Sequence, residues 1–303
     1  MKRFIFKITL FVSVFFIVEK GVYYFLHIAP DKEYDKRLEN ILKGNMNKEL
    51  VVLGSSKGAT DILAGQLEKE TGLISYNLSY QGSNVVFHEF LLKTLLKYNE
   101  VPKKVILVID IPYEFIEEKT LKFRIDRLYP LSKYNYINKE LINQKEKNIL
   151  SWFLCSARVN QSNFKFKNIK PPHFNPLDEY GSGPYIIEKH SKDLDYSLKK
   201  ETYNIKDELP YKIKAFKSIQ KLCGENSIEL TFVIPPNFFD LNRRFVKRFR
   251  KLLTDENKLF VYDTVNPIYR DEKYFNDYSH LFINGAKVLT SEISDFIINS
   301  DNK

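Results

Sequence analysis

Five short apolar runs rich in β-branched residues constrain the fold of this chain more than any other feature. They lie at 50–53, 73–78, 105–111, 228–234 and 259–261. Most are continuous rather than alternating, as expected for strands that are covered on both faces. Apolar residues with the three-or-four spacing of amphipathic helices separate or follow them. We therefore predict an α/β fold, a three-layer α/β/α sandwich with a five-stranded parallel, flavodoxin-like sheet.

The regular alternation stops between the third and fourth runs. The chain as a whole is 44% hydrophobic, which is sufficient for a packed core. A structureless loop as long as 112–206 is uncommon in a compact domain. We predict an inserted subdomain or lid over 112–206, within a domain that spans 49–300.

The N-terminal segment favours a membrane anchor. Its uninterrupted apolar run, 8–18, is shorter than the about 20 residues that span a bilayer, but 4–28 is long enough if Lys7 and Lys20 reach the head groups. No small-residue cleavage site follows. We predict an uncleaved signal anchor, a single-pass transmembrane helix over 1–29.

This anchor would place the rest of the chain outside the cytoplasm, after a juxtamembrane linker at 30–48. The Lys and Arg residues that precede the apolar segment would remain inside. The alternative is a buried first helix of a soluble protein.

The positive charge is concentrated in one stretch. Residues 119–170 hold nine Lys and three Arg against three acidic residues, an excess equal to the +9 of the whole chain, with eight aromatic residues among them. Such a stretch can bind nucleic acid, anionic lipid or an anionic glycan. Because the predicted compartment is extracytoplasmic, we expect no nucleic-acid partner.

The two cysteines, Cys155 and Cys223, match no metal-binding spacing. We expect no metal and no cofactor. A disulfide between them is one possibility outside the cytoplasm and is left open.

The first candidate for chemistry is Gly54-Ser55-Ser56, which follows the first strand and leads into a helix. A serine at a strand's carboxyl end can act as a nucleophile if a base activates it. The alternative is a tight turn with a helix cap.

The second candidate is Asp277-x-x-His280, just before the last helix. An aspartate three residues before a histidine can orient the imidazole and leave Nε2 to accept a proton from serine. A capping turn is the alternative.

Together with Asn77-Leu78-Ser79-Tyr80-Gln81-Gly82 after the second strand, these two blocks resemble the SGNH/GDSL hydrolases. More narrowly, they are similar to its membrane-anchored Gly-Ser-Ser branch, which includes teichoic acid D-alanyl-transfer and exopolysaccharide O-acetyl-transfer proteins. The resemblance covers roughly 49–111 and 228–298.

The resemblance implies Ser56 as nucleophile, His280 as base and Asp277 as its orienter. Ser55 is the alternative nucleophile. The backbone N–H groups of Ser56 and Gly82 would contribute to an oxyanion hole.

One block departs from the family. Its third block often reads Gly-x-Asn-Asp, whereas strand three here ends in Asp110-Ile111-Pro112. Asn84 is the candidate replacement for the missing oxyanion donor. Asp110 is a further candidate at this edge, or a cap.

We therefore predict an extracytoplasmic serine esterase or O-acyltransferase that acts on a cell-envelope glycan or glycolipid through an acyl-serine intermediate. A transferase would need an acyl donor, supplied by a multi-span membrane acyltransferase partner. The alternative is a catalytically degenerate SGNH-like subunit for glycan binding or assembly.

Overall fold

The computed structural model describes residues 1–187, 194–196 and 202–301. It divides into two compact units. One unit comprises 1–39 and 124–171, and the other comprises 40–123 and 172–303. The second unit contains the sheet.

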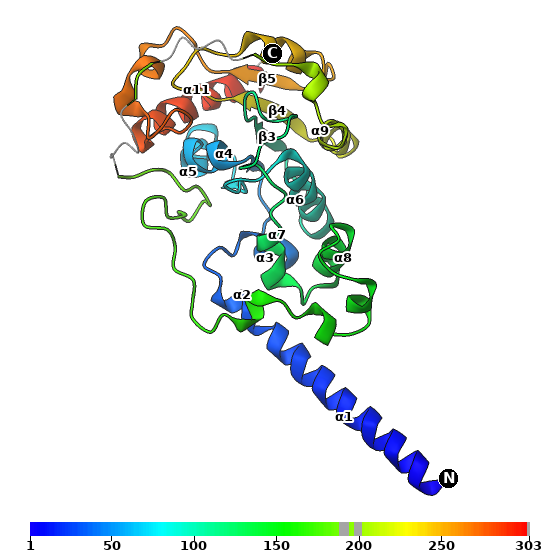
Figure 1. Cartoon of the computed structure of the whole chain (residues 1–303). Coiled ribbons are helices and arrows are strands. Elements are labelled where there is room, and N and C mark those ends of the chain that lie inside the picture. The colour runs from blue at the N-terminus through cyan, green and yellow to red at the C-terminus, as the bar shows by residue number, and fades with distance from the viewer. Residues whose placement is uncertain (188–193, 197–201, 302–303) are drawn as a thin grey trace. The chain divides into compact units, whose positions relative to one another are not determined.

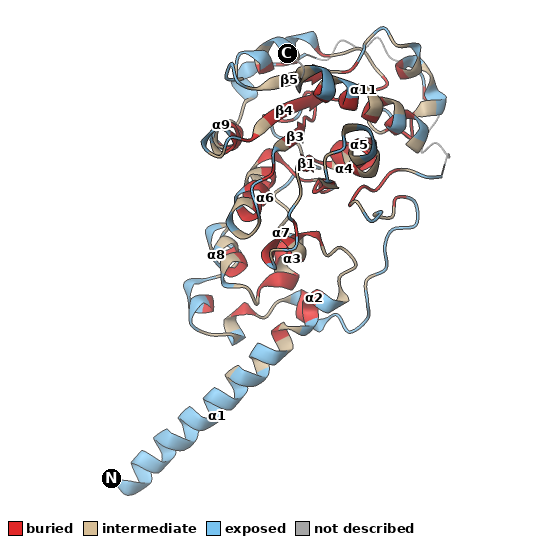
Figure 2. Cartoon of the chain, turned by 180° about the vertical axis from the view of Figure 1, so that it is seen from behind, coloured by how far each residue is buried: buried red, intermediate tan, exposed pale blue. Residues whose placement is uncertain are grey.

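The sheet unit is built on five parallel strands (Figure 1). They are β1 (Leu50–Leu53), β2 (Ser75–Asn77), β3 (Lys104–Val108), β4 (Glu229–Ile234) and β5 (Lys258–Val261). Their order is β2-β1-β3-β4-β5, with all neighbours parallel. Every residue of β1 is buried, in agreement with its continuous apolar run (Figure 2). The predicted α/β class and five-stranded parallel sheet are confirmed.

Helices flank this sheet, and two of them pack together on one side while three pack on the other (Figure 1). The first pair is α6 (Val85–Tyr98) and α9 (Pro210–Glu225). The second group is α4 (Ser56–Asp61), α5 (Ala64–Thr71) and α11 (Ile283–Asp301). Sequence signals define where two of these helices begin: the Asn84 side chain caps α6, and a proline starts α9.

A cluster of fully buried phenylalanines packs beside β4. Phe249, on α10 (Arg243–Arg250), lies between Phe216 of α9 and Phe232 of β4, with ring centroids 5.2 and 5.4 Å away. Phe115, from the beginning of the predicted insertion, stacks on the same ring at 6.0 Å. Segment 112–123 therefore belongs to the sheet unit, and Phe115 anchors it in the core.

The other unit joins the N-terminal segment to the middle of the chain. It contains α1 (Lys2–Leu26), α2 (Ile28–Lys32), α7 (Ile125–Leu128), α8 (Asn135–Asn143) and short 3-10 turns, and α3 (Arg37–Leu42) begins in it. The Ile169 N–H donates to the Lys32 carbonyl at 2.8 Å. The predicted insertion over 112–206 is thus divided: 124–171 packs with the N-terminal segment, and its other described residues pack with the sheet unit.

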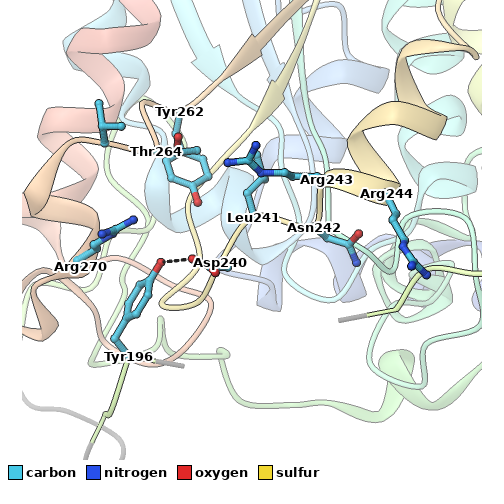
Figure 3. A pocket seen from close by; sticks show the side chains of 10 residues that line it. Tyr196, Asp240, Leu241, Asn242, Arg243, Arg244, Tyr262, Thr264 and Arg270 are labelled. Carbon is cyan, nitrogen blue, oxygen red and sulfur yellow. Dashed lines mark hydrogen bonds between the residues drawn. The ribbon is translucent and has the colours of Figure 1, made fainter. Parts of the chain in front are cut away.

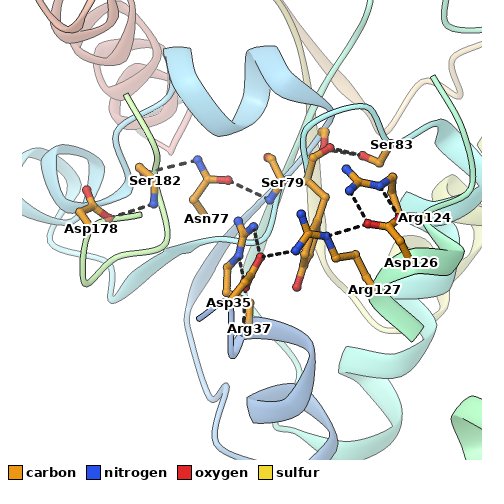
Figure 4. A network of polar contacts seen from close by, with 12 residues as sticks. Asp35, Arg37, Asn77, Ser79, Ser83, Arg124, Asp126, Arg127, Asp178 and Ser182 are labelled. Carbon is orange, nitrogen blue, oxygen red and sulfur yellow. Dashed lines mark hydrogen bonds and ion pairs between the residues drawn. The ribbon is translucent and has the colours of Figure 1, made fainter. Parts of the chain in front are cut away.

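An ion-pair network connects the N-terminal segment to 124–171 within this unit (Figure 4). Arg37 donates two hydrogen bonds to Asp35, at 2.9 and 2.7 Å, and Arg127 lies 4.0 Å from the same carboxylate. Burial raises the pKa of Asp35, but the Arg37 charge and hydrogen bonds outweigh it and hold the pKa below its usual value. The network lies between the N-terminal segment and 124–171.

The predicted transmembrane helix is not supported. Among the described residues, no helix is both long and apolar enough to cross a membrane. The helix over this segment, α1, has 25 residues, and Lys7, Glu19 and Lys20 interrupt its apolar character.

Both cysteines are free. Burial raises the pKa of the Cys223 thiol to about 12. The bridge that the sequence left open is therefore absent from this structure.

The phenylalanine cluster generates a stability prediction. Because Phe249 is fully buried among other rings, Phe249→Ala should lower the free energy of unfolding by about 3–5 kcal/mol. Tyr211→Ala, on the exposed face of α9, should change it by less than about 0.5 kcal/mol. Urea unfolding followed by circular dichroism measures both. Equal effects of the two substitutions would contradict the assigned packing.

Candidate active site

Ser56 is the first residue of α4, immediately after β1. The turn between them is tightly packed, because a Cβ added at Gly58 would lie 2.5 Å from Ser79 Oγ and one at Gly54 would lie 3.0 Å from Val108 Cβ. The two glycines therefore allow the turn to lie directly against its neighbours. This packing holds Ser56 at the carboxyl edge of the sheet.

Ser56 and His280 meet at this edge. The Ser56 Oγ lies 2.8 Å from His280 Nε2. The other ring nitrogen, Nδ1, lies 2.9 Å from both carboxylate oxygens of Asp277. Asp277 Oδ1 also accepts the backbone N–H groups of Ser279 and His280, at 2.7 and 3.0 Å. The structure thus brings together the three residues that the resemblance assigns to catalysis.

The charge of Asp277 affects both the pKa of the His280 imidazole and the ring nitrogen that carries its proton. Burial lowers the pKa of His280, but the hydrogen bond and charge of Asp277 outweigh it, so the pKa is raised above its ordinary value of 6.5. Burial raises the pKa of Asp277, and the contact with His280 lowers it by more. Because an ionised carboxylate can only accept, Nδ1 carries the proton and Nε2 accepts from Ser56.

Ser55 has a different environment from Ser56. It is almost fully buried, with 1% of its surface exposed, and it occupies the N-cap position of α4. Its hydroxyl lies near Asp110, whose pKa is raised by burial against the smaller opposing effects of Lys57 and Ser55. Of the two candidate nucleophiles, Ser56 is the one that contacts His280.

Gly82 and Asn84 lie in the loop between β2 and α6. Gly82 has a φ of +70°, which favours glycine, and its carbonyl accepts the Lys122 N–H at 2.8 Å. The Asn84 side-chain oxygen accepts the Phe87 N–H at 3.2 Å as the cap of α6. Their roles in an oxyanion hole stay predictions.

Asp61 is a buried carboxylate that the sequence analysis missed. It is fully buried at the end of α4, and its Oδ1 accepts from the Leu281 N–H at 3.0 Å and from the Thr60 hydroxyl at 2.6 Å. Burial raises its pKa to about 6, against the opposing effect of His280. Asp61 therefore holds the backbone directly after His280. An aspartate at a short helix end carries no sequence signal that separates it from an ordinary cap.

Tyr185 is a second residue that the sequence analysis missed. Its ring meets the His280 ring edge-on, with centroids 5.9 Å apart. Its carbonyl accepts the Ile283 N–H at 3.0 Å, at the start of α11. Burial raises the pKa of its hydroxyl to about 12. A part of the predicted insertion therefore forms one wall beside the histidine.

Asn77 ties this wall to the serine helix (Figure 4). Its side-chain amide donates to the carbonyls of Gly58 and Ile62, at 2.7 and 2.9 Å, and its backbone N–H donates to Tyr180 at 2.8 Å. Its side-chain oxygen accepts the Ser79 N–H at 2.9 Å. The asparagine of the second block therefore joins β2, α4 and the segment that precedes Tyr185.

A layer of buried charge surrounds Asp110. Lys57 donates to the Asn237 side-chain oxygen, and Lys212 donates to the Ile116 carbonyl at 2.6 Å. The Glu114 carboxylate accepts the Asp110 N–H at 2.9 Å, and burial together with Asp110 raises the pKa of Glu114 to about 8. This layer follows directly on β3, at the carboxyl edge of the sheet.

Comparisons with known proteins give similarity to solved structures only. No family model matches the chain, and no curated protein matches it. It is similar to a solved structure described as a "putative acylhydrolase" from Bacteroides fragilis, with 12% sequence identity, a TM-score of 0.41, and coverage of 88% of this chain and 95% of that chain.

The wall beside His280 generates a prediction at Gly181, which has a φ of +79°. A Cβ there would lie 2.4 Å from the Asn77 carbonyl oxygen, whereas Gly72, at φ +75°, has open space around it. Gly72→Ala should cost about 1–2 kcal/mol from its left-handed conformation alone. Gly181→Ala should lower the free energy of unfolding by more, because the backbone around Asn77 or Gly181 must move. It should also displace Tyr185. The free energy of unfolding is measured for both variants. Equal losses would show that the segment beside His280 is not held by the contact between Gly181 and Asn77.

Proposed function

We propose that this chain is a serine-dependent ester hydrolase or O-acyltransferase of the SGNH/GDSL type. The observation that carries the proposal is the continuous hydrogen-bond chain from Ser56 through His280 to Asp277. A hydroxyl, an imidazole and a carboxylate in this order form the arrangement that activates serine for acyl transfer.

The proposed reaction has two halves. Ser56 Oγ attacks the ester carbonyl and His280 Nε2 takes the hydroxyl proton, which it then gives to the departing alcohol, leaving an acyl-serine. A second hydroxyl then loses its proton to His280, attacks the acyl carbon and releases Ser56, which recovers its proton. Water as the second hydroxyl gives an esterase, and a sugar hydroxyl gives a transferase.

The finer part of the proposal rests on the sequence alone. The resemblance to the anchored branch supports a cell-envelope glycan or glycolipid as substrate, action outside the cytoplasm and a multi-span membrane acyltransferase as partner. The second candidate function is a degenerate subunit that binds glycan without turnover. The buried Asp110, in place of the family's usual asparagine, favours that alternative.

Covalent labelling separates the two candidates. A fluorophosphonate probe should label Ser56 in the intact protein, because only a serine activated by a base reacts at a useful rate. Ser56→Ala should abolish labelling, whereas Ser55→Ala should retain it, since Ser55 does not contact the histidine. Mass spectrometry of the labelled peptide measures the site. An unlabelled wild-type protein would favour the degenerate subunit.

The pH dependence follows from the His280–Asp277 pair. Neutral His280 is the active form, so kcat/KM for a small ester should rise with pH through a pKa above 6.5. Asp277→Asn removes the charge that raises this pKa. The acidic limb should move to lower pH, and the plateau should fall on the order of 10²–10⁴-fold because the imidazole loses its orientation. If the acidic side of the pH profile has the same midpoint in Asp277→Asn as in the wild type, His280 is not the titrating base.

A further inference from the structure

A cavity lies at the carboxyl edge of the sheet, around the start of α10 (Figure 3). Its volume is about 330 Å³. Its lining comes from the loop after β4, the first turn of α10, the loop after β5 and an aromatic residue of the segment 194–196. The lining residues include Asp240, Arg243, Arg244, Tyr262, Arg270 and Tyr196.

Positive charge exceeds negative charge in this cavity. Arg243, Arg244 and Arg270 line it together with one carboxylate, that of Asp240. Among the residues that the structure describes, none of these three arginines forms an ion pair. Arg248, one turn further along the same helix, instead donates two hydrogen bonds to Glu208, at 2.8 and 2.7 Å. The cavity therefore presents guanidinium groups whose charge no carboxylate of the described residues pairs within 4.0 Å.

Aromatic rings form another part of the wall. The Tyr196 hydroxyl donates to Asp240 at 3.1 Å, and the Arg270 guanidinium lies over the Tyr196 ring, 5.6 Å from its centroid. Tyr262 is buried, with its ring at the cavity between the two loops (Figure 3). Flat rings of this kind provide stacking faces for a sugar.

The positive surface continues along α10. A neighbouring cavity shares Arg243 and Tyr262 with the first and adds Lys247 and Arg250, against the single carboxylate of Asp263. Arg243, Lys247 and Arg250 are spaced four and three residues apart, so they lie on one helix face. The opposite face carries the buried Phe245 and Phe249.

The first cavity and Ser56 share an edge of the sheet. Its loops follow β4 and β5, and Ser56 follows β1, so all lie where the parallel strands end. The loop after β4 also contacts both parts of the candidate site. Asn237 accepts from Lys57, and the Phe238 N–H donates to the Tyr278 carbonyl at 2.9 Å.

We propose that this cavity binds an anionic sugar, with its phosphate or carboxylate on Arg243 and Arg270 and its ring against Tyr196 and Tyr262. A guanidinium fork matches either anion in two parallel hydrogen bonds, and a neutral sugar lacks that interaction. The binding does not depend on the chemistry of Ser56, so Ser56→Ala leaves it unchanged.

Calorimetric titration of the full chain with three matched probes tests this site. Glucose 1-phosphate and glucuronate carry the two anions, and glucose is the neutral reference. At low salt, at least one anionic probe should bind at least about tenfold more tightly than glucose, and added salt should weaken it. The stronger anionic probe identifies which of the two groups the site prefers.

Variants locate the binding. Arg243→Gln and Arg270→Gln, both at exposed side chains, should each weaken the anionic probe at least about tenfold, and Arg243→Lys should restore part of the loss. Lys251→Gln is the matched control, because it removes one charge from the exposed end of the same helix outside the cavity. Three results would overturn the proposal: no preference for either anionic probe, binding that survives both arginine substitutions, or an equal loss in Lys251→Gln.

Discussion

The hydrogen bond between Ser56 and His280 joins two residues that lie 224 positions apart in the chain. It forms because the parallel sheet brings the end of β1 and the turn before α11 to one edge. The docking of α11 against α4 and α5 then sets the distance, and the Thr290 hydroxyl accepts the Leu63 N–H at 3.1 Å as one fixed point of that docking. The geometry of the candidate site therefore depends on helix packing as much as on the site residues.

Two carboxylates control His280 from different directions. Asp277 bonds to the imidazole itself, whereas Asp61 bonds to the backbone N–H of Leu281 and acts on the ring only through its charge. Burial raises the pKa of Asp61 to about 6, whereas the hydrogen bond and charge of His280 outweigh burial at Asp277 and hold its pKa below the usual value, so the two differ in how readily they ionise. The half-buried Asp277 orients the ring, and the fully buried Asp61 anchors the turn.

The sequence was sufficient to predict the sheet because its strands are continuous apolar runs with β-branched residues. It also placed Ser56 and the Asp277–His280 turn at strand ends, where their proximity follows from topology. Asp61 and Tyr185 could not be found in this way, since their significance arises from burial against His280, which depends on contacts between distant segments. The N-terminal segment shows a further limit. Lys7 and Lys20 were interpreted as reaching head groups, yet α1 is not apolar enough to cross a membrane.

The departure at the third block has a structural counterpart. After β3, where the resemblance led us to look for an asparagine, the chain buries Asp110 beside Glu114 and places Lys57 and Lys212 near the pair. Burial raises the pKa of both carboxyl groups, and Lys57 and Lys212 oppose this effect at Asp110. Lys57 follows Ser56 directly and lowers the pKa of His280, against the effect of Asp277. The buried Lys57 side chain thus stands near the proposed reaction centre, and the charged layer around Asp110 acts on the same histidine that contacts Ser56.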